Sequence, residues 1–295
     1  MRNSKIIKIA LIVLLAIIIL YLLFNSFRNI EKLTGNKKNA ITVLTRGYGS
    51  NDGYEKLIHR NKQILSVFYN LLDNKDDYDV IIFHEGNITQ EQQNYIQSNT
   101  PEMPLRFTEV EFLNKNINNP YCPNTNLSNE FPLGYKNMCY FWSITFLEYL
   151  KNYDYIIRID EDCFLEKLDP NVILNYKKNN VMFSSAQYEK DDAKEVIIGL
   201  KEMFDGYLSK TGKTKKNELT MPYTNFMVVN IPFFRDNEDV INILAEIKNS
   251  DCIFSNRWGD LPIWGYILSY FIDRPLYFED KTVVYNHESH HVKIN

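Results

Sequence analysis

The chain has 295 residues, of which 45% are hydrophobic and 14% are aromatic. A chain of this length and composition can bury a sizeable core, which excludes an intrinsically disordered protein. Its formal net charge is only −4, so the composition indicates no nucleic acid or other polyanion as a partner.

An apolar stretch comes first along the chain. Residues 6–24 contain a single charge, Lys8, whose long side chain can reach the membrane surface, and their number is close to the ~20 that a helix needs to cross a bilayer. A cleaved signal peptide typically has an apolar region of about 7–15 residues that ends in small residues, whereas this run ends in bulky ones. We therefore predict a short cytoplasmic head at 1–5, a transmembrane anchor at 6–24 and a stem at 25–39.

The orientation of this anchor is predicted from the size of the parts on its two sides. Basic residues flank it on both sides, so the positive-inside rule does not decide. A short head and a large tail favour a single-pass type II protein with the tail in the lumen. N-glycosylation sequons at Asn87 and Asn126 agree with a lumenal tail. Up to two disulfides, or buried free thiols, are the two interpretations of the four cysteines: Cys122, Cys139, Cys163 and Cys252.

Residues 40–295 show strand and helix patterns in alternation. Strands are expected at 41–47, 79–84, 105–110, 153–159, 181–187 and 225–234, and the segment 275–287 follows the last expected helix. Helices are expected near 57–72, 89–98, 138–152, 239–249 and 258–270 and in a charged region that ends near 208, with a Pro- and Asn-rich loop at 115–132. There is no internal repeat and no second linker. We predict one α/β domain at 40–295, with a mixed sheet flanked by helices.

The expected strand at 153–159 ends in three consecutive acids, Asp160, Glu161 and Asp162. Ligands of open α/β sheets bind beyond the carboxyl ends of the strands, where these acids would lie. If the extended geometry continues, Arg158, Asp160 and Asp162 face the same side. Two such carboxylates can share a divalent cation with the phosphates of a nucleotide, as in the D-x-D motif of nucleotide-sugar transferases. A solvated turn paired with Arg158 is the alternative that these residues leave open.

Four stretches, in a fixed order, resemble the fungal Golgi α-1,2-mannosyltransferases of the yeast-type glycosyltransferase family 15. They are YKNMCYFWS (135–143), YDYIIRIDED (153–162), NFMVVNIPFFR (225–235) and RWGDLPIWGYILSYFID (257–273), followed by VVYNH (283–287). The resemblance implies a glycosyltransferase A-like, Rossmann-like fold behind a type II membrane anchor. It also implies transfer of mannose from GDP-mannose to a glycan or glycoprotein acceptor, with retention and an α-1,2-type linkage, in the presence of Mn²⁺ or another divalent cation.

The resemblance also assigns roles to individual residues. It implies nucleotide-sugar binding by Tyr135, Phe141, Arg158 and Asp160, and metal binding by Asp160, Asp162 and His287. It implies catalytic roles for Asp260 and Arg158. Without the resemblance, the residue types alone would suggest a helix N-cap for Asp260, an uninvolved histidine for His287 and core aromatic residues for Tyr135 and Phe141.

One departure from the family pattern matters for function. Met227 stands where the family has an acidic residue that is discussed as a possible nucleophile. Two alternatives therefore stay open beside a mannosyltransferase. One is a glycosyltransferase with another donor, such as a UDP-sugar. The other is a catalytically inactive carbohydrate-binding or scaffolding membrane protein.

Overall fold

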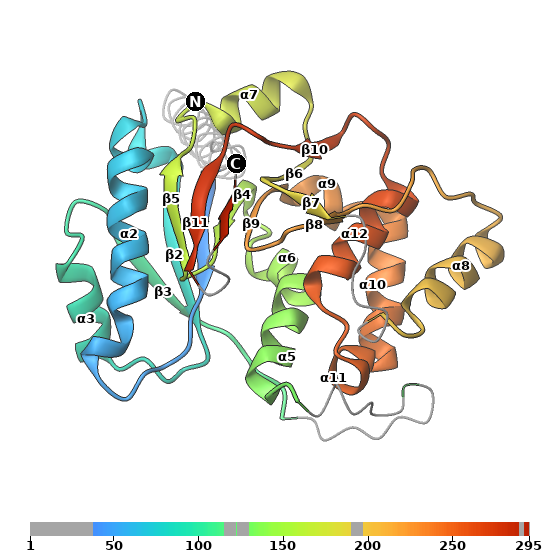
Figure 1. Ribbon diagram of the computed structural model, residues 1–295, viewed down its shortest axis with the longest axis horizontal. Helices are drawn as coiled ribbons and strands as arrows, with labels where there is room; N and C mark the ends of the chain where they lie inside the picture. Colours follow the sequence, from blue (N-terminus) through green and yellow to red (C-terminus); the bar gives the residue numbers. More distant parts are fainter. Residues whose placement is uncertain (1–37, 115–121, 123–129, 190–196, 289–291, 295) are drawn as a thin grey trace, which may run out of the picture. The chain divides into compact units, whose positions relative to one another are not determined.

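The computed structural model describes residues 38–114, 122, 130–189, 197–288 and 292–294, and residues 38–295 form one compact unit (Figure 1). The predicted head and anchor, and all but the last residues of the predicted stem, lie outside the described residues. Within the described ranges, no helix is long and apolar enough to cross a membrane.

A mixed sheet of seven strands forms the centre of this unit, in the order β10-β6-β9-β4-β1-β2-β3. The strands are β1 (Lys38–Leu44), β2 (Tyr78–His84), β3 (Leu105–Glu109), β4 (Tyr153–Ile159), β6 (Phe183–Ser185), β9 (Phe226–Asn230) and β10 (Tyr277–Glu279). β9 is antiparallel to both of its neighbours, and every other pair is parallel. All strands except β9 therefore point the same way, and their carboxyl ends share one edge of the sheet, the usual place for ligands.

Strand β4 is apolar on both faces, as expected for a central strand of a sheet that is covered on both sides. Ile157 and Ile159 pack in the core on one side of the sheet. Ile156 packs in the core on the other side. Because side chains alternate along a strand, Arg158 faces the same side as Ile156. A charged side chain at this position must find its partners inside the protein.

Helices cover both faces of the sheet (Figure 1). One face carries α2 (Glu55–Val67), α3 (Gln90–Ser98) and α7 (Val172–Asn179). The other carries α5 (Leu133–Tyr140), the π-helical turn η4 (Phe141–Thr145), α6 (Phe146–Tyr149), α8 (Leu200–Thr211), α9 (Ile231–Arg235), α10 (Glu238–Ser250), α11 (Cys252–Asn256) and α12 (Asp260–Phe271). The short 3₁₀ helices are η1 (Asn51–Tyr54), η2 (Tyr69–Leu71) and η3 (Lys75–Asp77).

Two small antiparallel sheets complete the unit. β5 (Cys163–Lys167), β11 (Val284–His287) and β12 (Val292–Ile294) form one sheet in the order β12-β11-β5. β7 (Tyr188–Glu189) and β8 (Met221–Pro222) form the other. The first of these sheets brings the segment after the three acids beside the last part of the described chain. It was not predicted from the sequence.

The predicted mixed sheet with helices on both faces is confirmed, with differences at element ends. The expected strand at 225–234 ends at Asn230, because the Asn230 side chain accepts a hydrogen bond from the backbone of Phe233 at 2.9 Å and caps α9. The expected helix at 138–152 instead begins at Leu133 and is interrupted by the π-helical turn η4. Such π-helical turns are frequent at functional sites.

Candidate active site

Arg158 lies at the centre of a buried charge cluster at the end of β4. Its side chain is 2% exposed. Its Nε and Nη2 donate to the two carboxylate oxygens of Asp160 at 2.8 and 3.0 Å, and its Nη1 donates to Asp260 at 2.5 Å. The guanidinium carbon lies 4.4 Å from the ring centroid of Trp142, in the π-helical turn. Arg158 is thus fixed on three sides by two carboxylates and an indole ring.

These contacts hold Arg158 in its charged form. Burial disfavours the charge, but Asp160 and Asp260 outweigh it and raise the pKa of the guanidinium above its usual value. Two carboxylates thus surround one buried guanidinium. Burial raises the pKa of Asp160, and the contact with Arg158 opposes this shift.

The three consecutive acids turn in three different directions. A turn closed by the Cys163 amide and the Asp160 carbonyl at 3.1 Å follows β4, so the expected extended geometry with Asp160 and Asp162 on one face is not what the structure shows. Asp160 pairs with Arg158, and Asp162 lies beside His287. Glu161 accepts hydrogen bonds from side chains that follow β1. Each carboxylate has its own partners, which reduces their mutual repulsion.

Glu161 connects the acid turn to the segment after β1. Its two oxygens accept from the hydroxyl of Thr45 at 2.5 Å and from the hydroxyl of Tyr48 at 2.5 Å. Burial, together with Glu161, raises the pKa of Tyr48 to about 12, so the phenol stays protonated and donates. The exposed guanidinium of Arg46 lies 5.0 Å from the Tyr48 ring centroid. The sequence analysis did not identify Thr45 and Tyr48 as partners of Glu161, because no local sequence motif indicates such a contact.

Arg60 of α2 supports the strand ends from the other face. Its Nε and Nη2 donate to the backbone carbonyls of Ile159 at 3.0 Å and Thr42 at 3.1 Å. It is fully buried, and burial lowers its pKa to about 10. The helical pattern of the sequence could have identified Arg60 as a buried residue. It falls between Leu57 and Ile64 on the apolar face of the helix, where a charged side chain needs a partner inside the protein.

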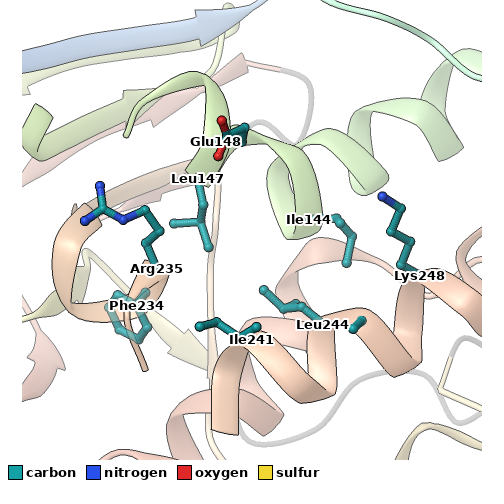
Figure 2. Close-up of a pocket in the computed structure, with 9 residues that line it drawn as sticks. Ile144, Leu147, Glu148, Phe234, Arg235, Ile241, Leu244 and Lys248 are labelled. Carbon is teal, nitrogen blue, oxygen red and sulfur yellow. The ribbon is translucent and has the colours of Figure 1, made fainter. Parts of the chain in front are cut away.

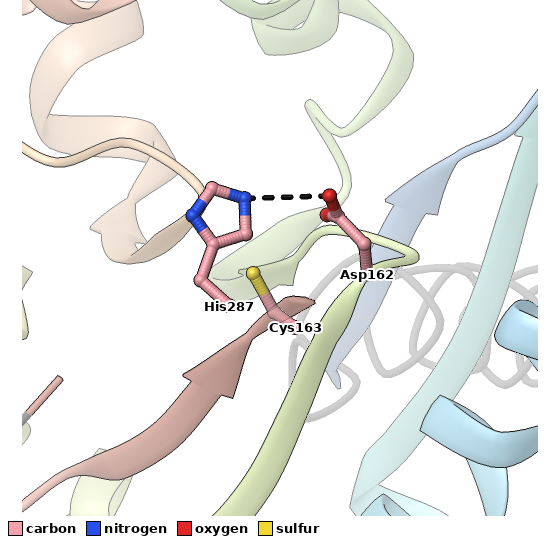
Figure 3. A group of neighbouring side chains, drawn as sticks. All are labelled: Asp162, Cys163 and His287. Carbon is pink, nitrogen blue, oxygen red and sulfur yellow. Dashed lines mark ion pairs between the residues drawn. The ribbon is translucent and has the colours of Figure 1, made fainter. Parts of the chain in front are cut away.

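Asp162, Cys163 and His287 form a group with metal-ligand chemistry (Figure 3). One potential ligand atom from each residue lies within 4.8 Å of the other two. His287 Nε2 is 3.4 Å from Asp162 Oδ2. Cys163 and His287 are direct cross-strand partners between β5 and β11, so the small sheet fixes their proximity. Burial raises the pKa of Cys163 well above that of a free thiol.

The His287 ring is oriented from its other nitrogen. Nδ1 lies 3.0 Å from the Tyr223 hydroxyl and 3.0 Å from the Asn225 amide nitrogen. Asn225 is itself held by the Tyr285 hydroxyl, which donates to Asn225 Oδ1 at 2.5 Å. The Asn225 amide nitrogen can only donate, so Nδ1 accepts from it and Nε2 carries the proton that faces Asp162. A metal ion bound at Nε2 would replace this proton. Tyr223 and Asn225 were not identified from the sequence.

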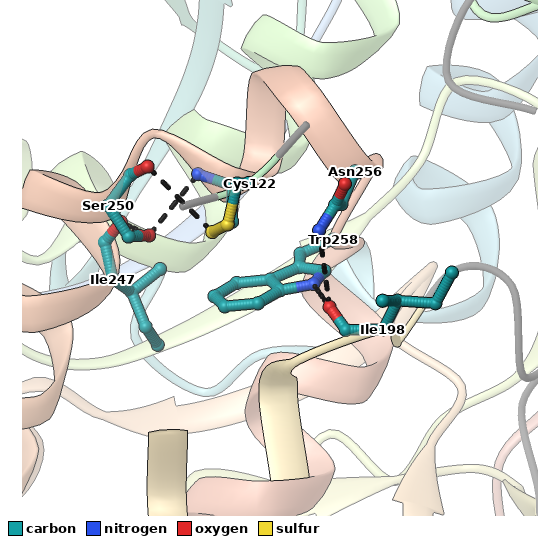
Figure 4. Close-up of a disulfide and its surroundings, with 7 residues drawn as sticks. Cys122, Ile198, Ile247, Ser250, Asn256 and Trp258 are labelled. Carbon is teal, nitrogen blue, oxygen red and sulfur yellow. Dashed lines mark hydrogen bonds between the residues drawn. A yellow bond between two sulfur atoms is a disulfide. The ribbon is translucent and has the colours of Figure 1, made fainter. Parts of the chain in front are cut away.

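Asp260 is the first residue of α12, and Gly259 is the N-cap. The helix N-terminus favours a carboxylate there. Trp258, two residues earlier, donates from its indole nitrogen to the Ile198 carbonyl at 2.8 Å, close to the disulfide between Cys122 and Cys252 (Figure 4). The turn that presents Asp260 is thus anchored by a buried indole. The four cysteines divide into this disulfide and two buried free thiols, Cys139 and Cys163.

The two predicted aromatic residues differ in their surroundings. Tyr135 is half-buried, and its hydroxyl accepts a hydrogen bond from Arg257 Nη2 at 2.9 Å, next to the turn that carries Asp260. Phe141 is 2% exposed and packs against Phe83 and Trp142. A contact between Phe141 and a nucleotide would require its ring to leave this core cluster.

Met227 lies on β9 directly opposite Arg158 and is fully buried. Its thioether therefore occupies the register position beside the charge cluster where the resemblance implies an acid. The structure brings Arg158, Asp160 and Asp260 into contact, and it pairs Asp162 with His287.

An apolar pocket lies elsewhere, between η4, α6, α9 and α10 (Figure 2). Ile144, Leu147, Phe234, Ile241 and Leu244 line it, together with Glu148, Arg235, Ala245 and Lys248. None of the predicted site residues borders this pocket. It contains no arrangement for nucleotide-sugar chemistry, and the candidate site is the group at the ends of β4, β5 and β11.

Comparison with solved structures finds this fold in known proteins. Core-mannan synthase A (CmsA/Ktr4) from Aspergillus fumigatus, in a Mn/GDP form, matches with a TM-score of 0.70 and 20% identity over 86% of this chain and 75% of that chain. The mannosyltransferase Ktr4p from S. cerevisiae matches with a TM-score of 0.69 and 17% identity over 86% and 71% of the two chains. Its complex with GDP matches with a TM-score of 0.68 and 18% identity over 86% and 72%.

Comparison of the sequence itself finds no matching family model and no matching curated protein. The likeness to the solved structures, at 20% identity or less, establishes the fold. The predicted glycosyltransferase A-like fold is therefore confirmed. The resemblance read from the sequence is confirmed at the same level, because these structures are yeast and fungal mannosyltransferases.

The buried cluster makes a prediction about stability. Asp260→Ala leaves Arg158 Nη1 without its charged partner while Asp160 still holds Nε and Nη2, and we expect a loss of about 3 kcal/mol in the free energy of unfolding. Asp273→Ala, which removes one partner of the exposed Lys216–Asp273 pair, is the matched control and should cost less than about 1 kcal/mol. Urea denaturation measures both. Equal losses in the two variants would show that Arg158 does not depend on Asp260.

Proposed function

We propose that this chain is a metal-dependent glycosyltransferase that transfers mannose from GDP-mannose to a glycan or glycoprotein acceptor. The observation that carries the proposal is the Asp162–Cys163–His287 group at the carboxyl edge of the sheet. It lies within a fold shared with a synthase in a Mn/GDP form and with a mannosyltransferase in complex with GDP. The donor set includes a carboxylate and an imidazole, which suit Mn²⁺ when phosphates and water complete the coordination.

Asp162 and His287 are the residues that would hold the cation. A bound divalent cation would supply positive charge beside the leaving diphosphate. Tyr223 and Asn225 orient the imidazole from behind, and the β5–β11 pairing fixes its distance from Asp162. The chain's own contribution is therefore a preorganised pair of ligands.

Arg158 and Asp260 are proposed to act as a pair. The contacts of Arg158 with Asp160 and Asp260 make it a positioning residue, because its guanidinium fixes both carboxylates. Asp260, 6% exposed at the start of α12, is proposed to orient the acceptor hydroxyl. Asp160, which keeps about a quarter of its side chain exposed, is proposed to face the nucleotide-sugar donor.

The inactive alternative has one observation in its favour, the buried Met227 opposite Arg158. A thioether cannot act as the carboxylate nucleophile of a double displacement. Retention is still possible by front-face attack, in which the leaving phosphate accepts the acceptor proton. We propose this route, with an α-1,2-type linkage, for the active enzyme.

The first test is binding of GDP by the full-length chain. We expect Mn²⁺ to strengthen GDP binding, measured by isothermal titration calorimetry, and Asp162→Ala or His287→Ala to weaken it by about tenfold or more. His59→Ala removes an exposed histidine outside the metal-ligand group and is the matched control. GDP affinity that is the same with Mn²⁺ and with a chelator would sink the proposal. Tighter binding of UDP than of GDP would move the donor to a UDP-sugar.

The second test concerns the reaction itself. With GDP-mannose and a mannoside acceptor, proton NMR of the first product should show an α-linkage. Met227→Leu keeps side-chain volume and should retain turnover, whereas Asp260→Asn should lower kcat by ~10²-fold. A β-linked product would reject retention, and no turnover by a chain that binds GDP-mannose and Mn²⁺ would favour the inactive alternative.

We also propose that residues 6–24 anchor the chain as a single-pass type II protein in the Golgi or the endoplasmic reticulum. The proposal is supported by the apolar run and by the Cys122–Cys252 disulfide, which suits an oxidising lumen. Protease treatment of sealed microsomes should leave residues 40–295 intact, and detergent should make them accessible. Complete digestion in sealed vesicles would reverse the orientation.

A further inference from the structure

We propose that Cys163 makes the cation site a site for soft metals as well, so that Asp162, Cys163 and His287 together bind Zn²⁺ more tightly than Mn²⁺. The inference rests on the proposed cation site, and it is independent of the donor sugar and of catalysis. It assigns a ligand that the resemblance does not imply, because the resemblance places the metal on Asp160, Asp162 and His287.

The distances suit a shared ion. Zn²⁺ lies about 2.3 Å from a cysteine sulfur and about 2.0–2.2 Å from imidazole nitrogen and carboxylate oxygen, so ligand atoms in its tetrahedral coordination are about 3.5 Å apart. The three ligand atoms already lie within 4.8 Å of one another. Figure 3 shows the Cys163 sulfur directed at the space between the His287 ring and the Asp162 carboxylate. Side-chain rotations that move the ligand atoms by about 1 Å close the remaining difference.

Backbone pairing keeps the thiol in this place. Cys163 and His287 are directly opposite in the β5–β11 ladder, and opposite residues project from the same face of a sheet. Asp162 is the next residue in the chain, and the Glu288 amide donates to the Asp162 carbonyl at 3.0 Å. Cys163 is fully buried, so its sulfur is enclosed by protein atoms.

Ligand chemistry then ranks the metals. Thiolate sulfur selects Zn²⁺ and other soft ions, whereas Mn²⁺ prefers oxygen, and Mn²⁺ is also the weakest binder among the first-row divalent ions. On binding, the sulfur–hydrogen bond is replaced by a sulfur–metal bond and the proton passes to the solvent. The Cys163 sulfur would thus be a strong ligand for Zn²⁺ and a weak one for Mn²⁺. Zn²⁺ would therefore displace Mn²⁺ from this site.

Cys139 offers a matched comparison within the same chain. It is also a buried free thiol, with 1% exposure. Among the described residues, the group that could hold a metal contains Cys163 and not Cys139. A signal from any buried thiol would come from both cysteines, whereas a signal from the proposed site comes from Cys163 alone. The disulfide occupies the two other cysteines under non-reducing conditions.

The experiment is titration of the full-length chain with Co²⁺, a spectroscopic substitute for Zn²⁺, without nucleotide and without reductant. We expect a sulfur-to-cobalt charge-transfer band in the near ultraviolet for the wild type and for Cys139→Ser, and none for Cys163→Ser. Added Zn²⁺ should abolish the band. Competition with Co²⁺ should show that Cys163→Ser lowers Zn²⁺ affinity by about tenfold or more, while Mn²⁺ affinity, followed by electron paramagnetic resonance, changes by less than about threefold.

Several results would overturn the inference. Co²⁺ binding by the wild type without a charge-transfer band, or a band that survives in Cys163→Ser, excludes Cys163 as a ligand. If Cys163→Ser fails to fold, Cys163→Val takes its place, because valine suits the apolar surroundings of this position. The charge-transfer band of the wild type, compared with the spectrum of that variant, then decides the outcome. A band together with GDP binding that ignores Mn²⁺ would reject the proposed function and retain this inference. GDP binding that depends on Mn²⁺, without a charge-transfer band, would support the proposed function and reject this inference.

Discussion

The buried charge of Arg158 is the constraint on which the site depends. A guanidinium at 2% exposure is tolerated only where carboxylates and an aromatic face replace water. Asp160 is a local partner, and two other segments supply the remaining ones. β4 carries the arginine, η4 brings Trp142 and the start of α12 brings Asp260. Packing of the two helical segments against the sheet is therefore tied to the pairing of one charge. This arrangement places a carboxylate at a defined position on the edge of the sheet.

The acid turn shows how consecutive like charges can be accommodated without a common counter-ion. Asp160 faces an arginine, Glu161 faces two hydroxyl donors and Asp162 faces an imidazole. Asp160 holds the arginine of β4, Glu161 links the turn to the segment after β1, and Asp162 links it to the small sheet. The turn is accordingly a junction of three structural units, and a change in any one of them alters the surroundings of the other two.

Sequence patterns predicted what is local in this structure. The continuous apolar run of β4 and the charges after it located the edge of the sheet, and helical periodicity located α2, α3, α10 and α12. The small sheet escaped prediction because β5 is short and gains its partner from a segment more than a hundred residues later. Contacts between residues that are far apart in the sequence, such as Glu161 with Tyr48, produce no periodic sequence pattern. Tyr223, Asn225 and Cys163 were missed for the same reason, since only the fold brings them to His287.

The pairing of β5 with β11 has a consequence for the order in which the chain matures. Synthesis runs from the N-terminus, so β4, the acid turn and β5 leave the ribosome long before His287. During that interval Cys163 has neither its strand partner nor the imidazole beside it. The Asp162–Cys163–His287 group is completed only when the segment that carries β11 docks. A nascent chain can thus assemble most of its central sheet before this group exists, and the proximity of the three side chains is a mark of a finished fold.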